Sequence, residues 1–411
     1  MARVWNWQRW GRCDDLIHQS DLNGIIGQFG CPQQFLRKKE ERATGGFAYE
    51  NASGKLASGN ATHAVIHRVM RSAPALDVVL AHPQTEQRIG DSAICDSFDE
   101  EFDRACAGRP VDWYKTDAHK WKADCCAMIR GLFIDIHEHV GEVVLAECAF
   151  VYPLDDMWLT GAIDLVYRAR LDDGSISTQL SFADWKTGKQ RPHQIDLDHG
   201  WQSGIYGNAM RDAYFVPFEN VTPREGQEHR DAVEEVCVEI AVAWQRVIEG
   251  PENQTTIEGE DPRADLDAIV AKHGARKFGE YPERIRYVHL RDYIPYARAT
   301  KKMLDRPEEI AWAGLAEKGK VAFVKGDTRG PAWYHVNRSE SDTPRLRHLL
   351  RAVVSWVRFG RFPAAPGEKC TRCKFKAPCL TDGYKPIGEE KRQLDLIRDD
   401  LDGFTGLEDE L

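Results

Sequence analysis

Hydrophobic residues between positions 143 and 186 come in short apolar, β-branched and aromatic runs, which are typical of strands. The runs predict three antiparallel strands over Val143–Tyr152, Trp158–Leu171 and Ser175–Lys186. The turn signal Asp172-Asp173-Gly174 separates the second strand from the third. We therefore expect a meander with short turns.

Elsewhere apolar residues recur three or four positions apart, the period of an amphipathic helix. They predict helices over residues 20–40, 59–72, about 194–211, 228–249 and 345–359. Residues 83–142 are predicted to be mainly helical, residues 285–296 and 320–324 are candidate strands, and residues 258–262 and 337–343 are predicted loops. Strands and helices along one chain predict an α/β fold.

The predicted hairpin carries polar residues suited to phosphate chemistry. Side chains two apart on a strand share a face, so Asp184 and Lys186 point the same way and Trp185 points into the other layer. If the strands pair, Asp164 comes alongside Asp184. Two carboxylates and an ammonium can bind a hard divalent cation with a water beside it. A solvated Asp-Lys pair on an exposed hairpin fits the same pattern, because a D-x-K triplet is common.

Composition and charge place few limits on function. The 411 residues are 42% hydrophobic and 29% charged, an ordinary globular balance. No apolar run approaches the ~18–20 residues of a membrane span, and no signal core is present at the start of the chain. We expect a cytoplasmic protein without a membrane partner. The net charge of −10 argues only weakly against DNA binding, because residues 386–411 are strongly acidic and residues 361–385 are basic.

Histidine and cysteine spacing adds two candidate metal sites. His63 and His67 lie four apart and share a helix face, which suits metal binding, although a structural histidine fits there too. The eleven cysteines include Cys370, Cys373 and Cys379 in a Cys-x2-Cys-x5-Cys segment. With a further cysteine, this spacing suits zinc or an iron–sulfur cluster.

Five blocks in order resemble the RecB-like branch of the PD-(D/E)XK nuclease superfamily. The closest likeness is to its iron–sulfur members, the CRISPR-associated RecB-like exonucleases and the nuclease domain of AddB. The blocks are the helix from Ser20 to Cys31-Pro32, Gly59-x-x-x-His63, Gly161 to Asp164 with Asp184-Trp185-Lys186, Gln202-x-x-x-Tyr206, and Cys370 to Cys379.

The resemblance implies a restriction-endonuclease-like core, which is a central mixed sheet flanked by helices, with extra helical segments and a terminal iron–sulfur clasp. We expect a single domain over residues 1–385, with its core at about 140–210 and a helical insert at about 211–283. Residues 386–411 are expected to form a flexible acidic tail.

The resemblance also implies the roles of the site residues. His63, Asp164 and Asp184 would bind Mg²⁺ or Mn²⁺, and Lys186 would orient or deprotonate the attacking water and stabilise charge on the phosphate. Gln202 and Tyr206 would hold the DNA or support the site. Glu147 matches a further ligand position of the family, although a solvent-facing strand glutamate fits as well.

The terminal cysteines complete the implied cofactors. Cys31, Cys370, Cys373 and Cys379 would bind a 4Fe–4S cluster with a structural role, and zinc remains the alternative.

The predicted function is a metal-dependent DNA exonuclease that acts on single-stranded ends in recombination, repair or phage DNA metabolism. No Walker A motif is present, so a separate helicase or recombinase is an expected partner. The alternative function is a DNA-end-binding subunit of a recombination or CRISPR-adaptation complex, with weak catalysis.

Overall fold

The structure is a computed structural model, and it describes most of the chain between residues 52 and 358. The described residues are 16–18, 22, 52–72, 76–77, 91–106, 108–113, 117–154, 157–188, 192–225, 227, 229–249, 261–294 and 332–358. The chain divides into two compact units, of which the larger comprises Asp15–Gln19 and Ala48–Arg347 and holds nearly all the described elements. The predicted domain over residues 1–385 and the predicted tail stay predictions.

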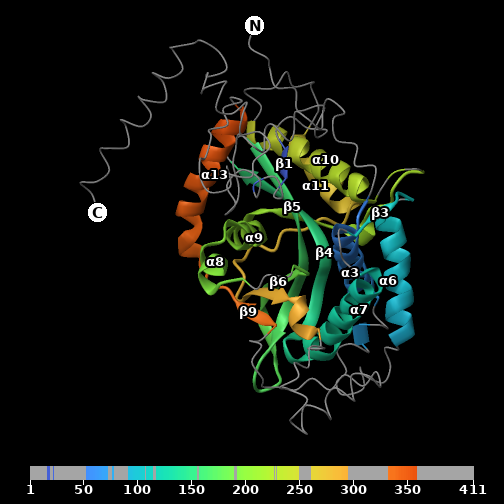
Figure 1. The fold of residues 1–411 in the computed structure, drawn as a ribbon. Helices are drawn as coiled ribbons and strands as arrows, with labels where there is room; N and C mark the ends of the chain where they lie inside the picture. The colour runs from blue at the N-terminus through green and yellow to red at the C-terminus, as the bar shows by residue number, and fades with distance from the viewer. Residues whose placement is uncertain are drawn as a thin grey trace, which may run out of the picture. The chain divides into compact units, whose positions relative to one another are not determined.

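One mixed sheet forms the centre of the larger unit (Figure 1). In the described part of the chain it has seven strands, in the order β7-β4-β5-β6-β8-β9, with β1 paired to β5. The strands are β1 (Leu16–His18), β4 (Val140–Leu154), β5 (Met157–Arg170), β6 (Ile176–Lys186), β7 (Tyr214–Pro217), β8 (Ile285–His289) and β9 (Trp333–His335). The strands β2 (Ala52–Ser53) and β3 (Val111–Asp112) form a separate parallel pair.

The predicted meander is confirmed. β4, β5 and β6 pair antiparallel in chain order. β8 then pairs parallel to β6, and β9 and β7 pair antiparallel to β8 and β4. The segment predicted as a helical insert therefore also contributes β7 to the sheet.

Helices flank the sheet, as the sequence predicts. They are α3 (Gly54–Arg71), α6 (Asp91–Cys106), α7 (Ala118–Asp135), α8 (Gln194–His199), α9 (Trp201–Asp212), α10 (His229–Glu249) and α11 (Pro262–Lys272). A further helix, α13 (Thr343–Arg358), begins in the larger unit and continues into the smaller one. Short 3₁₀ turns are η2 (Ile136–Glu138), η3 (Phe218–Asn220), η4 (Leu290–Tyr293) and η5 (Glu340–Asp342). No described helix is long and apolar enough to cross a membrane.

Several predicted helix boundaries are wrong for local reasons. α3 begins at Gly54 instead of residue 59, because the Ser53 side chain caps the helix by accepting from the Leu56 amide. The predicted helix over 194–211 is two helices, since Gly200 has an extended backbone between α8 and α9. α11 was not predicted, although Asp261 caps its first turn.

Two predicted segments near the C-terminal half also differ. The candidate strand over residues 285–296 is β8 followed by η4, and the predicted loop over 337–343 contains η5. The candidate strand over 320–324 lies outside the described residues.

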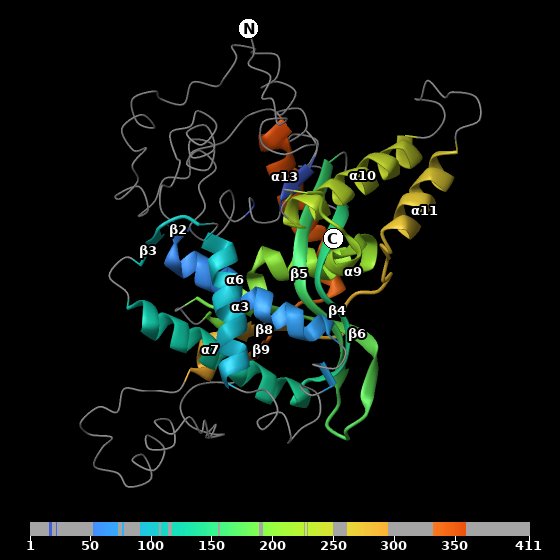
Figure 2. The same cartoon turned by 90° about the vertical axis from the view of Figure 1, so that its right-hand side faces the viewer.

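The main core lies between the sheet and the layer of α3, α6 and α7, which lie side by side (Figure 2). Ile66 of α3, Ile129 of α7 and Trp185 of β6 are all 0% exposed and belong to this core. The prediction that Trp185 points into the other layer is confirmed. Burying a large apolar side chain contributes about 1.5–3 kcal/mol, so this core holds the helix layer on the sheet.

Candidate active site

Three carboxylates lie side by side on the three central strands. Leu165 of β5 pairs with Ala183 of β6, so the next position brings Asp164 beside Asp184. The β4–β5 pairs on either side place Glu147 opposite Asp164. Neighbouring strands are ~4.8 Å apart, so each of these carboxylates lies beside the next one in the row. We call Glu147, Asp164 and Asp184 the acidic row.

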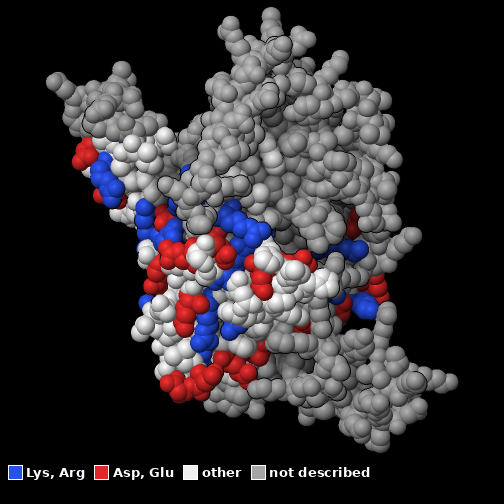
Figure 3. All heavy atoms as spheres, turned by 90° about the vertical axis from the view of Figure 1, so that its left-hand side faces the viewer, with Lys and Arg blue, Asp and Glu red and all other residues white. Residues whose placement is uncertain are grey.

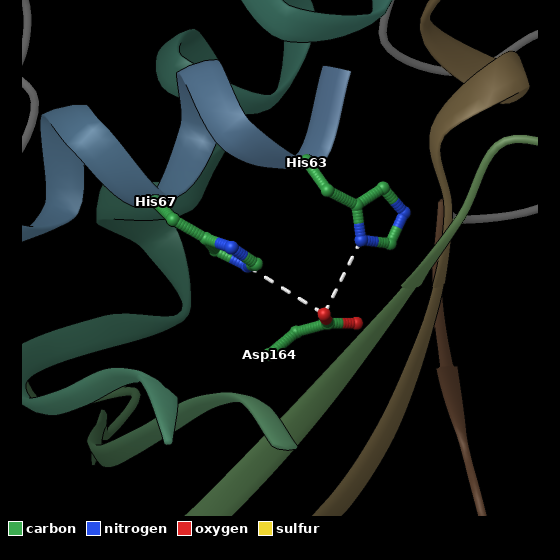
Figure 4. A group of neighbouring side chains, drawn as sticks. All are labelled: His63, His67 and Asp164. Atoms are coloured by element: carbon green, nitrogen blue, oxygen red, sulfur yellow. Dashed lines mark hydrogen bonds and ion pairs between the residues drawn. The ribbon is translucent and has the colours of Figure 1, made fainter. Parts of the chain in front are cut away.

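Two histidines of α3 point toward the middle of the acidic row (Figure 4). The Nδ1 atom of His63 lies 3.3 Å from Oδ1 of Asp164, and Nε2 of His67 lies 3.5 Å from the same oxygen. The other oxygen of Asp164 accepts a 2.7 Å hydrogen bond from the Trp185 amide. One side of this carboxylate is therefore fixed by the backbone, and the other faces two imidazoles.

His67 lies between two carboxylates. It is 2% exposed, and its Nδ1 atom is 2.9 Å from Oε2 of Glu147. Neither ring nitrogen has hydrogen-bond geometry with a partner among the described residues. Burial alone would lower the pKa of His67, but Glu147 and Asp164 outweigh burial and raise it to about 9. Without a metal ion, His67 is thus a cation at neutral pH.

Glu147 has an unusual backbone and two cationic partners. Its φ of 51° is the one positive value of a non-glycine residue in the described part of the chain. Such a conformation costs roughly 1–2 kcal/mol, and an irregularity of the β4–β5 register lies just before it. The carboxylate pairs with Arg71 and with His67. Burial would raise the pKa of Glu147, but these two cations lower it to about 2.

The other end of the acidic row faces a lysine and an amide. The Lys186 Nζ atom lies 2.6 Å from Oδ2 of Asp184. From α9, Gln202 Nε2 donates to Oδ1 of Asp184 at 3.2 Å and to the Tyr206 hydroxyl at 2.9 Å. Tyr206 is 3% exposed, so this support comes from inside the protein. Strand β6 and helix α9 together position Asp184.

The two central carboxylates titrate differently. Burial raises the pKa of Asp184, and the nearby Asp164 charge adds to this, while Lys186 opposes it. The pKa of Asp164 is well below its ordinary value, because His63 and His67 outweigh the effect of burial. Burial would lower the pKa of Lys186, but Asp184 and Asp164 raise it. In the metal-free protein Lys186 is therefore a firmly held ammonium.

The donor set around Asp164 fits a divalent cation. One ligand atom each from His63, His67 and Asp164 lie within 4.8 Å of one another. The Nε2 atom of His67 is buried, lacks a hydrogen bond and faces Asp164, and a metal ion would satisfy it by displacing the proton of the imidazolium. The oxygen and imidazole ligands suit Mg²⁺ or Mn²⁺, with Mn²⁺ favoured by the imidazoles.

The structure brings together seven of the predicted site residues. They are His63, Glu147, Asp164, Asp184, Lys186, Gln202 and Tyr206. The site residues that the family resemblance implies do not include His67 or Arg71. The four-residue spacing from His63 was a signal for His67, whereas the sequence carries no signal that would pair Arg71 with Glu147.

The predicted cluster ligands Cys31, Cys370, Cys373 and Cys379 lie outside the described residues. None of the cysteines in the described part forms a disulfide; they are Cys95, Cys106, Cys125, Cys126, Cys148 and Cys237. The iron–sulfur cluster stays a prediction.

Comparison with known families agrees with this architecture and site. The family model of the PD-(D/E)XK nuclease superfamily matches residues 30–380, which is most of the chain. The protein therefore belongs to the PD-(D/E)XK nuclease superfamily. Its mixed sheet with flanking helices agrees with the predicted restriction-endonuclease-like core. A search of curated proteins found no match.

Proposed function

We propose that this chain is a metal-dependent DNA exonuclease of the RecB-like branch, acting on single-stranded ends in DNA recombination, repair or phage DNA metabolism. The observation that supports it most is the acidic row, which ends in Asp184 with Lys186 at 2.6 Å. A protein that only bound DNA would have no need for carboxylates beside the phosphate, since they repel it.

The proposed metal ligands are His63, Asp164 and Asp184, with Glu147 as a further candidate and His67 as an addition from the structure. A divalent cation held there would lower the pKa of a bound water and neutralise negative charge on the scissile phosphate. Asp164 is suited to this role because its pKa is well below the ordinary value, which keeps it ionised.

Lys186 is proposed to orient the attacking water and to stabilise the negative charge that develops on the phosphate. Its raised pKa favours this role over that of a general base. Gln202 is proposed to hold Asp184 in position through its hydrogen bond, with Tyr206 fixing the amide in turn.

A 4Fe–4S cluster on Cys31, Cys370, Cys373 and Cys379 is the second part of the proposal. It is supported by the cysteine spacing in the sequence together with the resemblance to the iron–sulfur members of the family. Iron and acid-labile sulfide should be present after anaerobic purification. Colourless protein that contains one zinc ion per chain would show that these cysteines form a zinc site instead of a cluster.

DNA is the proposed partner, with a separate helicase or recombinase in the cytoplasm supplying ends. The charge on the face shown in Figure 3 is mixed: Lys and Arg lie among Asp and Glu in the part that the structure describes. We therefore expect DNA binding to depend on the metal site and on contacts with the bases more than on a basic surface.

The decisive test compares linear and circular single-stranded DNA in Mg²⁺ or Mn²⁺. Wild-type protein should degrade the linear DNA from an end and leave the circle intact. Asp184→Asn should lose cleavage. Asp172→Asn, an identical change at the exposed turn of the same hairpin, should keep it.

The outcomes separate the candidate functions. Cleavage of the circular DNA would show that the protein is an endonuclease and not an exonuclease. Equal cleavage by wild type and Asp184→Asn would remove the proposed site. Binding of DNA ends without any cleavage would favour the end-binding subunit.

A further inference from the structure

The acidic row continues across the sheet into two tyrosines. In the parallel pairing of β6 with β8, Asp184 lies opposite Tyr287. In the antiparallel pairing of β8 with β9, Tyr287 lies opposite Tyr334. Paired residues on neighbouring strands direct their side chains to the same face. The two aromatic rings therefore follow the carboxylates on the same face of the sheet.

The tyrosine pair is held in a defined geometry. The ring centroids of Tyr287 and Tyr334 are 6.2 Å apart with an interplanar angle of 80°, and both residues are half-buried. The Tyr334 hydroxyl donates to Oδ2 of Asp292 at 3.1 Å. Asp292 is itself 3.2 Å from Nδ1 of the buried His289. A ring that is fixed at its hydroxyl end loses little entropy when a flat ligand packs on it.

The spacing suits a nucleotide that spans the site and the rings. At ~4.8 Å per strand, Tyr287 lies about 5 Å and Tyr334 about 10 Å from the strand position of Asp184. A phosphate held at Asp184 would therefore have its attached or adjacent base over the tyrosines. Burial, followed by the charge of Asp184, raises the pKa of Tyr287, in agreement with a short distance between these side chains.

We propose that Tyr287 and Tyr334 form a stacking platform for the base of an unpaired nucleotide next to the scissile phosphate. The inference rests on the proposed nuclease function and names the residues that would select an unpaired strand. A base inside a duplex is already stacked and paired, so only an unpaired base can take this position. Stacking on aromatic rings also tolerates every base, and the platform therefore selects strand state and not sequence.

The test compares oligonucleotides that have the same phosphates and differ in their bases. Oligothymidylate and an abasic oligomer of equal length are bound to the protein by fluorescence anisotropy. Ca²⁺ replaces Mg²⁺, because it accepts the same oxygen ligands and this test needs binding alone. Wild type should bind oligothymidylate at least about tenfold more tightly than the abasic oligomer.

Variants of Tyr334 separate stacking from structural support. Tyr334→Leu should lose most of the base preference and bind the abasic oligomer as wild type does. Tyr334→Phe keeps the ring and should keep the preference. The proposal is overturned if Tyr334→Leu retains the preference, or if it weakens binding of both oligomers equally, as a structural role would.

A second measurement needs no variant and covers the case in which Tyr334→Leu does not fold. A single 2-aminopurine is moved along the oligonucleotide, and its fluorescence with wild-type protein is recorded. Stacking predicts quenching confined to one or two positions beside the end phosphate. Uniform fluorescence at every position would overturn the platform. Metal-dependent cleavage by wild type, measured separately, shows whether such a failure belongs to the platform or to the nuclease function.

Discussion

The two ends of the acidic row are built differently. At the β4 end, Glu147 is enclosed by the cations His67 and Arg71, and its pKa is lowered to about 2. At the β6 end, burial raises the pKa of Asp184, and its partner Lys186 is one third exposed. A carboxylate fixed by charge pairs suits a structural role, whereas one beside an accessible ammonium suits chemistry. The difference separates what holds the site together from what reacts there.

The largest effect is expected at the β6 end. Lys186→Met removes the ammonium that faces the phosphate, and cleavage should fall about 10²–10³-fold, as for other losses of a preorganised charge. Folding should be retained, because the remaining Asp184 carboxyl accepts a proton readily in its buried position. Single-turnover rates and thermal unfolding measure the two effects. A fall in the cleavage rate smaller than about tenfold would show that Lys186 does not take part in the reaction.

The β4 end should respond mainly in stability. Glu147→Gln removes the carboxylate that His67 and Arg71 share, and the free energy of unfolding should fall by about 2–3 kcal/mol. The control is Glu142→Gln on the same strand, where an exposed pair with Arg168 should contribute no more than about 1 kcal/mol. Urea unfolding with EDTA compares them. Equal losses of unfolding free energy in the two variants would mean that the buried ion pairs stabilise the protein no more than the exposed pair does.

The same pair predicts a pH window in the metal-free protein. The pKa of Glu147 falls from 4.5 to about 2 on folding, so its contribution is complete above pH 4.5 and is lost as the pH falls to 2. The pKa of His67 rises from 6.5 to about 9, so its contribution is complete below pH 6.5 and is lost as the pH rises through 9. The stability difference between wild type and Glu147→Gln should therefore be largest between pH 4.5 and 6.5. A difference that is constant from pH 3 to 9 would contradict this.

The next prediction concerns the contribution of His63 to metal affinity. His63 is 27% exposed and pairs with Asp164 alone among the ion pairs of the described residues, so His63→Ala should weaken Mn²⁺ binding about 10–100-fold with little loss of stability. His199→Ala, at an exposed position on α8, is the control. Isothermal titration with Mn²⁺ gives the affinities. Unchanged Mn²⁺ affinity in His63→Ala would show that this imidazole does not bind the metal.

The smallest effect is expected from the hydrogen bond that fixes Gln202. Tyr206→Phe removes one hydroxyl acceptor of about 1 kcal/mol, and cleavage should fall only about fivefold. Gln202→Leu should cost more, because it also removes the donor to Asp184. The reverse order would show that Tyr206 has a direct role with DNA.

The sequence predicted the meander and the facing of Asp184, Lys186 and Trp185, because the two-residue period of a strand determines them. Through the family resemblance, it also predicted that His63, Gln202 and Tyr206 belong to the same site as these residues. The site of His67 between two carboxylates could not be predicted, since it depends on the packing of α3 against β4. The positive φ of Glu147 and its pairing with Arg71 depend on the same tertiary packing.

The tyrosine platform shows a similar limit. Tyr287 and Tyr334 are 47 positions apart in the sequence, and only the register of β8 with β6 and β9 brings them to the end of the acidic row. Local propensity predicts a strand at residue 285, but it does not predict which strand lies beside it or in which direction. Long-range pairing carries that information.

The most direct test of the acidic row as a metal-dependent centre is a crystal of the protein grown with Mn²⁺ and measured at the manganese absorption edge. An anomalous peak should lie between the Asp164 and Asp184 carboxylates, within reach of the His63 imidazole, and should disappear in Asp184→Asn. Manganese bound elsewhere, with the acidic row occupied only by the Lys186 and His67 ion pairs, would contradict the account.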